Sequence, residues 1–157
     1  MNSYTALAGR IRLMLVDLEG VIARTQLLLD KYLQTDDDGY LDGVALNLHG
    51  YYSGIERIFE DIAIGMGEGS PSGPNWHHDL LLQMSAAIND SRPPIISAEG
   101  RQCLDEYRGF RHVVRNIYTF NLRPSRLIDL TEDLPGCYET VSEDIGKFVD
   151  FLEEISP

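Results

Sequence analysis

The amino-acid sequence predicts an all-α fold, an up-and-down bundle of about five helices. Apolar residues recur at three- and four-residue steps over several long stretches, which is the period of a helix with one buried face. No segment alternates apolar and polar residues as a half-buried strand does. With 157 residues, of which 43% are apolar, the chain is expected to form a single domain over residues 1–157 with a core of its own.

The first two predicted helices are long. The first apolar stripe spans residues 7–33, and the acidic run at 36–38 followed by Gly39 ends it. A second stripe spans residues 41–62. It stops before residues 65–74, which hold four glycines and two prolines and are predicted to form a loop.

The third predicted helix is short, and the fourth is long. Asn75 is a candidate N-cap for the third, whose apolar face is formed by Trp76, Leu80, Met84 and Ile88. Ser97 can cap a fourth helix over residues 98–120. After a turn near Pro124, one or two last helical pieces keep the helical period despite Pro135.

Composition limits the classes of function. Thirteen Lys and Arg stand against 25 Asp and Glu, so the net charge of −12 excludes a protein that coats nucleic acid by bulk positive charge, and any RNA or phosphate site must be local. Charged residues interrupt the apolar N-terminal segment, which predicts neither a signal peptide nor a membrane span. The two cysteines have no metal or disulfide-framework spacing, which favours a reduced, soluble, cytoplasmic chain.

Positive charge is concentrated in residues 101–126. This segment holds six of the 13 basic residues, all arginines, and only two acids. Arginine binds phosphate oxygens in a bidentate manner, which makes the segment a candidate phosphate or RNA site. The alternative, that these arginines pair with carboxylates of neighbouring helices, has about equal weight from composition alone.

A helical wheel of the fourth helix places several polar side chains on one face. Arg101, Arg108 and Arg115 fall nearly in line, and we expect them to bind RNA. The flanking positions belong to Arg111 and Tyr118 on one side and His112 and Asn116 on the other. Cationic neighbours favour the neutral imidazole of His112, the form that a general base needs.

The segment from Arg111 to Tyr118 resembles the signature of HepT-like toxins, which belong to the HEPN superfamily of all-helical ribonucleases. That signature is an Arg, four residues, a His, one residue and a Tyr. Here Arg111 matches the Arg and Tyr118 the Tyr, while Asn116 stands at the position of the His. The resemblance implies a metal-independent endoribonuclease without cofactors, in which the ribose 2′-hydroxyl attacks phosphorus, a His moves protons and the Arg stabilises the developing charge.

Asn116 departs from this signature in a way that bears on chemistry. An amide can hold substrate but cannot exchange a proton near neutral pH. Either His112, one helical turn earlier, replaces the missing His, or activity is weak or absent. A natural or engineered His-to-Asn change that makes a toxin tolerable to its host is a third possibility.

The resemblance also implies partners. The first is a second copy of the chain: the resemblance implies a homodimer whose two motif helices meet and form a composite site. The RNA substrate that it implies is tRNA or mRNA. The antitoxin of HepT-like toxins is a small, MntA-like nucleotidyltransferase that neutralises the toxin by transferring AMP to the motif Tyr. Here the acceptor would be Tyr118, and an adenylate there would add negative charge and block RNA from the arginines.

Two rival readings remain from the sequence. One is a catalytically inactive binding partner of a nucleotidyltransferase with the same fold, and the other is a purely structural helical bundle. The adjacent His77 and His78 have no further ligand at zinc spacing, and the acidic run at 36–38 lacks the pattern of a calcium loop. We therefore expect no metal site.

Overall fold

The structure is a computed structural model that describes residues 3–116 and 122–157. Within these residues it contains five α-helices: α1 (Ser3–Thr35), α2 (Gly39–Gly65), α3 (Trp76–Ser85), α4 (Ala98–Asn116) and α5 (Pro124–Ile155). The described residues form no strand and only one isolated β-bridge, between Ile88 and Arg92. The predicted all-α bundle is therefore confirmed.

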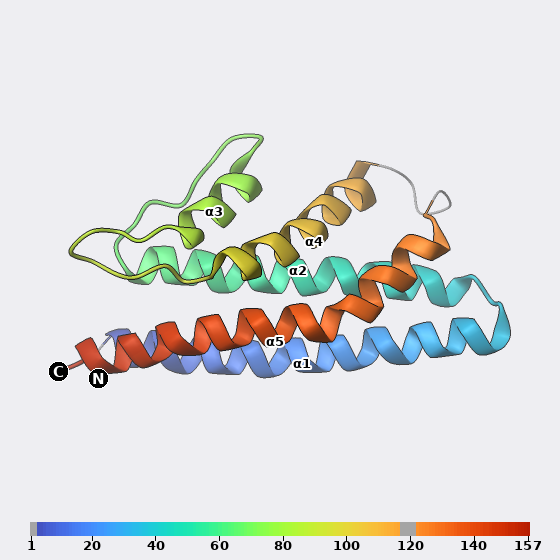
Figure 1. The fold of residues 1–157 in the computed structure, drawn as a ribbon, viewed down its shortest axis with the longest axis horizontal. Coiled ribbons are helices and arrows are strands. Elements are labelled where there is room, and N and C mark those ends of the chain that lie inside the picture. Colours follow the sequence, from blue (N-terminus) through green and yellow to red (C-terminus); the bar gives the residue numbers. More distant parts are fainter. Residues whose placement is uncertain (1–2, 117–121) are drawn as a thin grey trace.

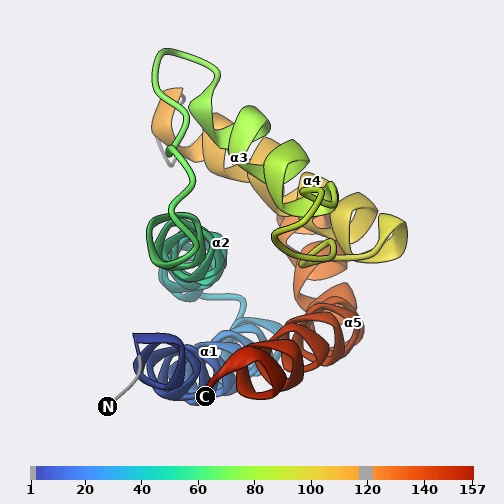
Figure 2. The same ribbon diagram turned by 90° about the vertical axis from the view of Figure 1, so that its left-hand side faces the viewer.

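Helix α2 lies at the centre of the arrangement and packs against each of the other four helices. Helices α1 and α2 form an antiparallel pair, and α5 runs beside α1 so that both ends of the chain lie at the same end of the bundle (Figure 1). Helices α3 and α4 cover the side of α2 opposite to α1 (Figure 2). Helix α2 therefore has α1 on one side and α3 and α4 on the other, and it also contacts α5.

Glycines on α2 let α1 approach closely. A Cβ atom added at Gly43, Gly54 or Gly65 would lie within 3 Å of a leucine side chain of α1. The leucines that fill these positions are Leu28, Leu18 and Leu7, respectively. The three glycines are eleven residues apart, about three helical turns, so each faces the same side of α2.

Helix α4 is fixed at its start by a side-chain cap. The Ser97 hydroxyl accepts a hydrogen bond from the Gly100 amide at 3.0 Å, which confirms the predicted N-cap. Asp144 of α5 accepts hydrogen bonds from both the amide and the hydroxyl of Ser97. The cap thus joins α4 to α5 as well as beginning the helix.

A disulfide between Cys103 and Cys137 also joins α4 to α5. The expectation of reduced, unpaired cysteines is therefore wrong. The residues are 34 positions apart in the chain, but the two helices cross where their Cα atoms are 5.7 Å apart, within the range that a disulfide spans. Spacing along a sequence does not reveal such a crossing.

The third helix is shorter than its apolar spacing predicts. It ends at Ser85, and Ile88 lies beyond it in the bridge to Arg92. The Asn75 side chain makes no capping hydrogen bond; its backbone carbonyl accepts from the Asp79 amide instead. Arg92 accounts for the early end of α3, because its buried guanidinium donates to Glu68 and to the Gln83 and Ala86 carbonyls and so holds the loops on both sides of the helix together.

The last helix continues through Pro135 as one element, which resolves the choice between one and two pieces. Proline has no N–H to offer the carbonyl four residues earlier, that of Thr131. Figure 1 shows α5 turning away from α1 toward its N-terminal part, where it meets α4. The fourth helix is described to Asn116, and residues 117–120 of its predicted span lie outside the described residues.

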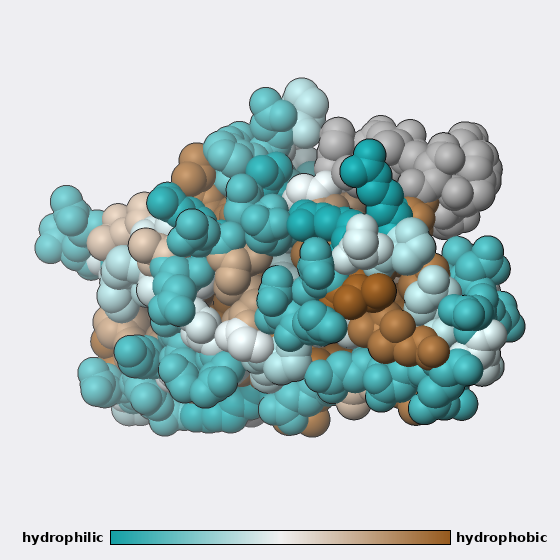
Figure 3. Space-filling model, turned by 45° about the vertical axis from the view of Figure 1, so that its right-hand side comes forward, coloured by the Kyte–Doolittle hydropathy of each residue, from teal (hydrophilic) through white to brown (hydrophobic). Residues whose placement is uncertain are grey.

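One face of the molecule is mainly polar. Figure 3 shows a largely hydrophilic face on which hydrophobic side chains occupy a smaller area. No helix in the described part of the chain has the length and apolarity needed to cross a bilayer.

Candidate active site between α2, α3 and α4

Arg111 points into the bundle, not onto the open face predicted by the helical wheel. Leu104 and Tyr107 of α4 are buried, and Arg111 continues their stripe at the next helical position. Its side chain is only 14% exposed and faces α2 and α3. The correction is informative, because a guanidinium in a core position needs polar partners there.

Glu56 of α2 is one of these partners. Its side chain is 4% exposed, on the apolar face of α2 between Tyr52 and Phe59. The Arg111 Nε lies 3.8 Å from the Glu56 Oε1, an ion pair without a hydrogen bond. Burial raises the pKa of Glu56 to about 7, although the positive charge of Arg111 acts in the opposite direction.

His77 of α3 joins the carboxylate to the guanidinium. Its Nδ1 lies 2.6 Å from Glu56 Oε2, and its Nε2 lies 3.0 Å from Arg111 Nη1. A guanidinium only donates, so Nε2 accepts and the proton of the neutral ring is on Nδ1, where it is donated to Glu56. The Trp76 ring lies against the imidazole, with centroids 3.6 Å apart. Geometry and hydrogen bonding thus fix both the tautomer and the ring orientation.

Tyr52 places a second polar group behind the cluster. It lies one turn before Glu56 on α2, and its buried hydroxyl has no hydrogen-bond partner among the described residues. Burial, and then the charge of Glu56, raises the pKa of Tyr52. The Arg111 Nε is likewise buried and without a hydrogen bond in the described structure. Buried polar atoms of this kind are costly for stability, which makes the cluster a candidate functional site.

The other arginines of the basic segment are more exposed. Arg108 pairs with Asp105 of the same helix at 2.7 Å, and Arg126 of α5 pairs with Glu106 of α4 at 3.1 Å. Arg101 lines a cleft of about 640 Å³ between α3 and α4 together with His78. The structure therefore pairs Arg111 and Arg126 with carboxylates of neighbouring helices, as the alternative to an RNA site anticipated, and Arg108 with a carboxylate of its own helix.

The other predicted site residues lie in the last turns of α4 or beyond its described end. His112, Arg115 and Asn116 belong to the last turns of α4, but the described structure does not include their side chains. Tyr118 lies outside the described residues. The proposed roles of these four residues stay predictions.

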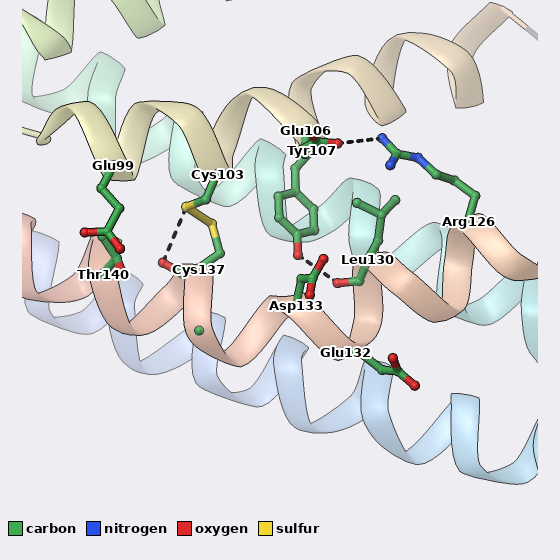
Figure 4. Close-up of a pocket in the computed structure, with 11 residues that line it drawn as sticks. Glu99, Cys103, Glu106, Tyr107, Arg126, Leu130, Glu132, Asp133, Cys137 and Thr140 are labelled. Carbon is green, nitrogen blue, oxygen red and sulfur yellow. Dashed lines mark hydrogen bonds and ion pairs between the residues drawn. A yellow bond between two sulfur atoms is a disulfide. The ribbon is translucent and has the colours of Figure 1, made fainter.

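A second cleft lies between α4 and α5, around the disulfide (Figure 4). Four acidic side chains line it, namely Glu99, Glu106, Glu132 and Asp133. The Tyr107 hydroxyl donates to the Leu130 carbonyl at 2.7 Å in its wall. This acidic lining is unsuited to RNA, so the candidate site is the cluster around Arg111.

Sequence reasoning missed Glu56 and His77. Glu56 had a readable signal, because a carboxylate stands on an otherwise apolar helical face, at a position where the stripe of α2 is buried. The pair of adjacent histidines suggests, at most, a zinc ligand for His77. Its partners come from two other helices, 21 and 34 residues away, which no local pattern reveals.

Comparison with known protein families identifies the family of this chain. The family model described as HepT-like protein matches residues 43–152, from the first glycine contact of α2 to near the end of α5. This range covers α3, α4 and all of α2 from Gly43 onward, and it includes every residue of the cluster. The comparisons with curated proteins and with solved structures gave no match.

Proposed function

The chain belongs to the HepT-like family of the HEPN superfamily. On this premise we propose that it is the toxin of a toxin–antitoxin pair, a metal-independent endoribonuclease whose substrate phosphate binds to Arg111. The observation that carries the proposal is the position of Arg111 between the Glu56 carboxylate and the His77 imidazole. This places a fixed cation next to a group that can exchange protons, as RNA cleavage by the 2′-hydroxyl requires.

Arg111 supplies charge stabilisation in this proposal. The guanidinium has five N–H donors in a planar fork, of which one contacts His77 and the Nε–H has no hydrogen-bond partner in the described structure. These donors suit phosphate oxygens, on which negative charge builds as the 2′-oxygen attacks. Arg101, Arg108 and Arg115 would extend the cationic surface along α4 toward the RNA backbone, and Asn116 would hold substrate through its amide.

We further propose that Tyr118 is the site of neutralisation by a nucleotidyltransferase antitoxin. AMP on its phenol would place a phosphate and a base two residues after Asn116, close along the chain to the arginines that bind RNA. A homodimer in which two α4 helices meet would bring Arg111 of one copy toward Asn116 of the other. The substrate would be tRNA or mRNA.

A second function is favoured by a specific observation. Arg108 and Arg111 already have carboxylate partners, and Asn116 cannot exchange protons. A catalytically inactive binding partner of a nucleotidyltransferase would keep the same helices without cleaving RNA.

The test is cleavage of a cellular RNA pool in EDTA by the parent protein and by three variants. We expect the parent to cleave, Arg111→Ala to lose at least about 100-fold in rate, and Arg24→Ala to match the parent. Arg24 is an exposed arginine on α1, away from the cluster, and controls for the loss of a positive charge. A silent parent with an active Asn116→His variant would select the binding partner instead. If the parent and Asn116→His are both silent, the proposed ribonuclease function is wrong.

A further inference from the structure

A ribonuclease site at Arg111 needs a group that takes and returns a proton. The amide of Asn116 cannot do so, and the guanidinium of Arg111 stays charged. Two groups that titrate contact Arg111 in the described structure, namely Glu56 and His77. The choice between them depends on which one substrate can reach.

Exposure separates the two groups. The Glu56 side chain is 4% exposed and lies behind the imidazole, whereas the His77 side chain is 18% exposed, similar to the 14% of Arg111. A phosphate that approaches the guanidinium therefore reaches His77 before Glu56. The inner position of Glu56 suits a residue that acts through the imidazole rather than on the substrate.

We propose that His77 is the proton carrier of this site, in place of the missing signature His, and that Glu56 positions it. The proposal rests on the ribonuclease function proposed above. Its geometric basis is the chain Glu56 Oε2, Nδ1 and Nε2 of His77, and Arg111 Nη1, with distances of 2.6 Å and 3.0 Å. The Nδ1–H bond to Glu56 leaves the lone pair of Nε2 directed at the place where Arg111 would hold phosphate.

The reaction balances with these groups alone. Phosphate oxygens take over the N–H donors of Arg111, which frees the Nε2 lone pair of His77. Nε2 accepts the proton of the ribose 2′-hydroxyl as the 2′-oxygen bonds to phosphorus, and the bond from phosphorus to the 5′-oxygen breaks. The imidazolium, stabilised by the Glu56 carboxylate, then returns the proton to the leaving 5′-oxygen. The products are a 2′,3′-cyclic phosphate and a 5′-hydroxyl.

Trp76 contributes to the same arrangement. Its ring lies against the imidazole at 3.6 Å, which limits rotation of the His77 side chain at the start of α3. Helix α3 is itself held by the loops that Arg92 and Glu68 join. His77 therefore lies on a rigid support, as a proton carrier requires.

The experiment compares cleavage by three histidine variants under single-turnover conditions in EDTA, on the same cellular RNA pool. We expect His77→Ala to lose at least about 100-fold in rate. His78→Ala is expected to keep the parent rate, and His112→Ala tests the alternative proton carrier on α4. His78 is the matched control, because it is the next residue on α3 and is half-exposed. Thermal unfolding of each variant checks that α3 is folded.

Two further readouts distinguish chemistry from a structural role. Added imidazole is expected to restore cleavage to His77→Ala but not to Arg111→Ala, because a free base replaces only a lost base. Glu56→Gln is expected to lower the cleavage rate about 10-fold. Its binding to labelled 2′-O-methyl RNA, which lacks the attacking hydroxyl, is expected to be unchanged.

Each other outcome overturns a stated part. If the parent cleaves and Arg111→Ala does not, while His77→Ala keeps its rate, the role of His77 is wrong and the ribonuclease function stands. If only His112→Ala loses cleavage, His112 is the proton carrier instead of His77. If the parent does not cleave RNA, both the ribonuclease function and the role of His77 are wrong. This holds also when Asn116→His restores activity, because His77 then does not suffice as the proton carrier.

Discussion

The two sides of α2 differ in what they bury. Toward α1 it presents glycines that accept leucine side chains, and the buried part of this contact is apolar. The ion pair between Arg10 of α1 and Asp61 of α2 is partly exposed. Toward α3 and α4 it presents Tyr52 and Glu56, buried polar groups that face His77 and Arg111. Apolar burial stabilises a fold directly, whereas a buried ion pair returns little net stability. The side of α2 toward α1 therefore stabilises the fold. The side toward α3 and α4 positions reactive groups, and their burial lowers the stability of the fold.

Removing a leucine from the α1 side should have the largest effect on stability. Leu18→Ala deletes a buried side chain that packs on Gly54, and we expect the free energy of unfolding to fall by about 2–5 kcal/mol. Urea denaturation measures the change. Leu13→Ala, at an exposed position of the same helix, is the control and should stay within about 0.5 kcal/mol of the parent. Equal effects of the two variants would contradict the packing described for α1 and α2.

Breaking the disulfide should loosen the α4 side selectively. Reduction, or the Cys103→Ser and Cys137→Ser double substitution, is expected to lower the free energy of unfolding by about 4 kcal/mol, because the closed loop of 34 residues gains freedom in the unfolded chain. Hydrogen exchange measured along the chain should rise first in α4 and remain slow in α1 and α2. Uniform acceleration across all helices would show that the two sides of α2 do not differ in this respect.

Glu56 should make stability depend on pH. Its pKa is raised from 4.5 to about 7 in the folded protein, so the folded state binds this proton more tightly than the unfolded state. The raised pKa of Glu56 therefore costs no stability below about pH 4.5. As the pH rises from 4.5 to 7, the free energy of unfolding decreases, because the folded state holds a proton that the unfolded state releases. Relative to the parent, Glu56→Gln is expected to gain about 1–3 kcal/mol between pH 5 and pH 8.

Urea denaturation at pH 5, 6, 7 and 8 measures this gain. The same Glu56→Gln substitution in a His77→Gln background is the control for titration of the imidazole. A constant difference between parent and variant over this pH range would mean that Glu56 titrates normally.

The smallest effect is expected at the exposed pair between α4 and α5. Arg126→Gln removes an ion pair with Glu106 that lies at the surface, and we expect a change below about 0.5 kcal/mol. Thermal unfolding in low and high salt checks this value. A larger loss would show that α4 is anchored by charge as well as by the disulfide.

The sequence predicts the helices better than it predicts the site. The apolar period locates all five helices, and the Ser97 cap is found where the residue type indicates it. The period fails at Ile88, because the hydrogen bonds of Arg92 end α3 earlier. These hydrogen bonds join residues that are separated in the sequence, so periodicity carries no information about them.

The site required the tertiary structure. The family signature indicates Arg111, but the helical wheel predicts its side chain on the solvent side of α4. The buried stripe through Leu104 and Tyr107 carries it inward. His77 and Glu56 become partners only when α3 packs against both α2 and α4. The cysteine pair is the same kind of case, since it depends on where two helices cross.

The glycine spacing on α2 has a consequence for how the molecule tolerates change in length. The three glycines are eleven residues apart and accept leucines that are ten or eleven residues apart. The two helices therefore pack in one axial alignment. Sliding by one turn, about 5.4 Å, would bring leucines against side chains instead of glycines. Gly54 lies two residues before Glu56, so the alignment in which Leu18 packs on Gly54 also fixes the position of the Glu56 carboxylate along the bundle axis. Insertions that spare this alignment are confined to the loops, and a single residue gained or lost within α1 or α2 would rotate one half of the helix by about 100° against its partner.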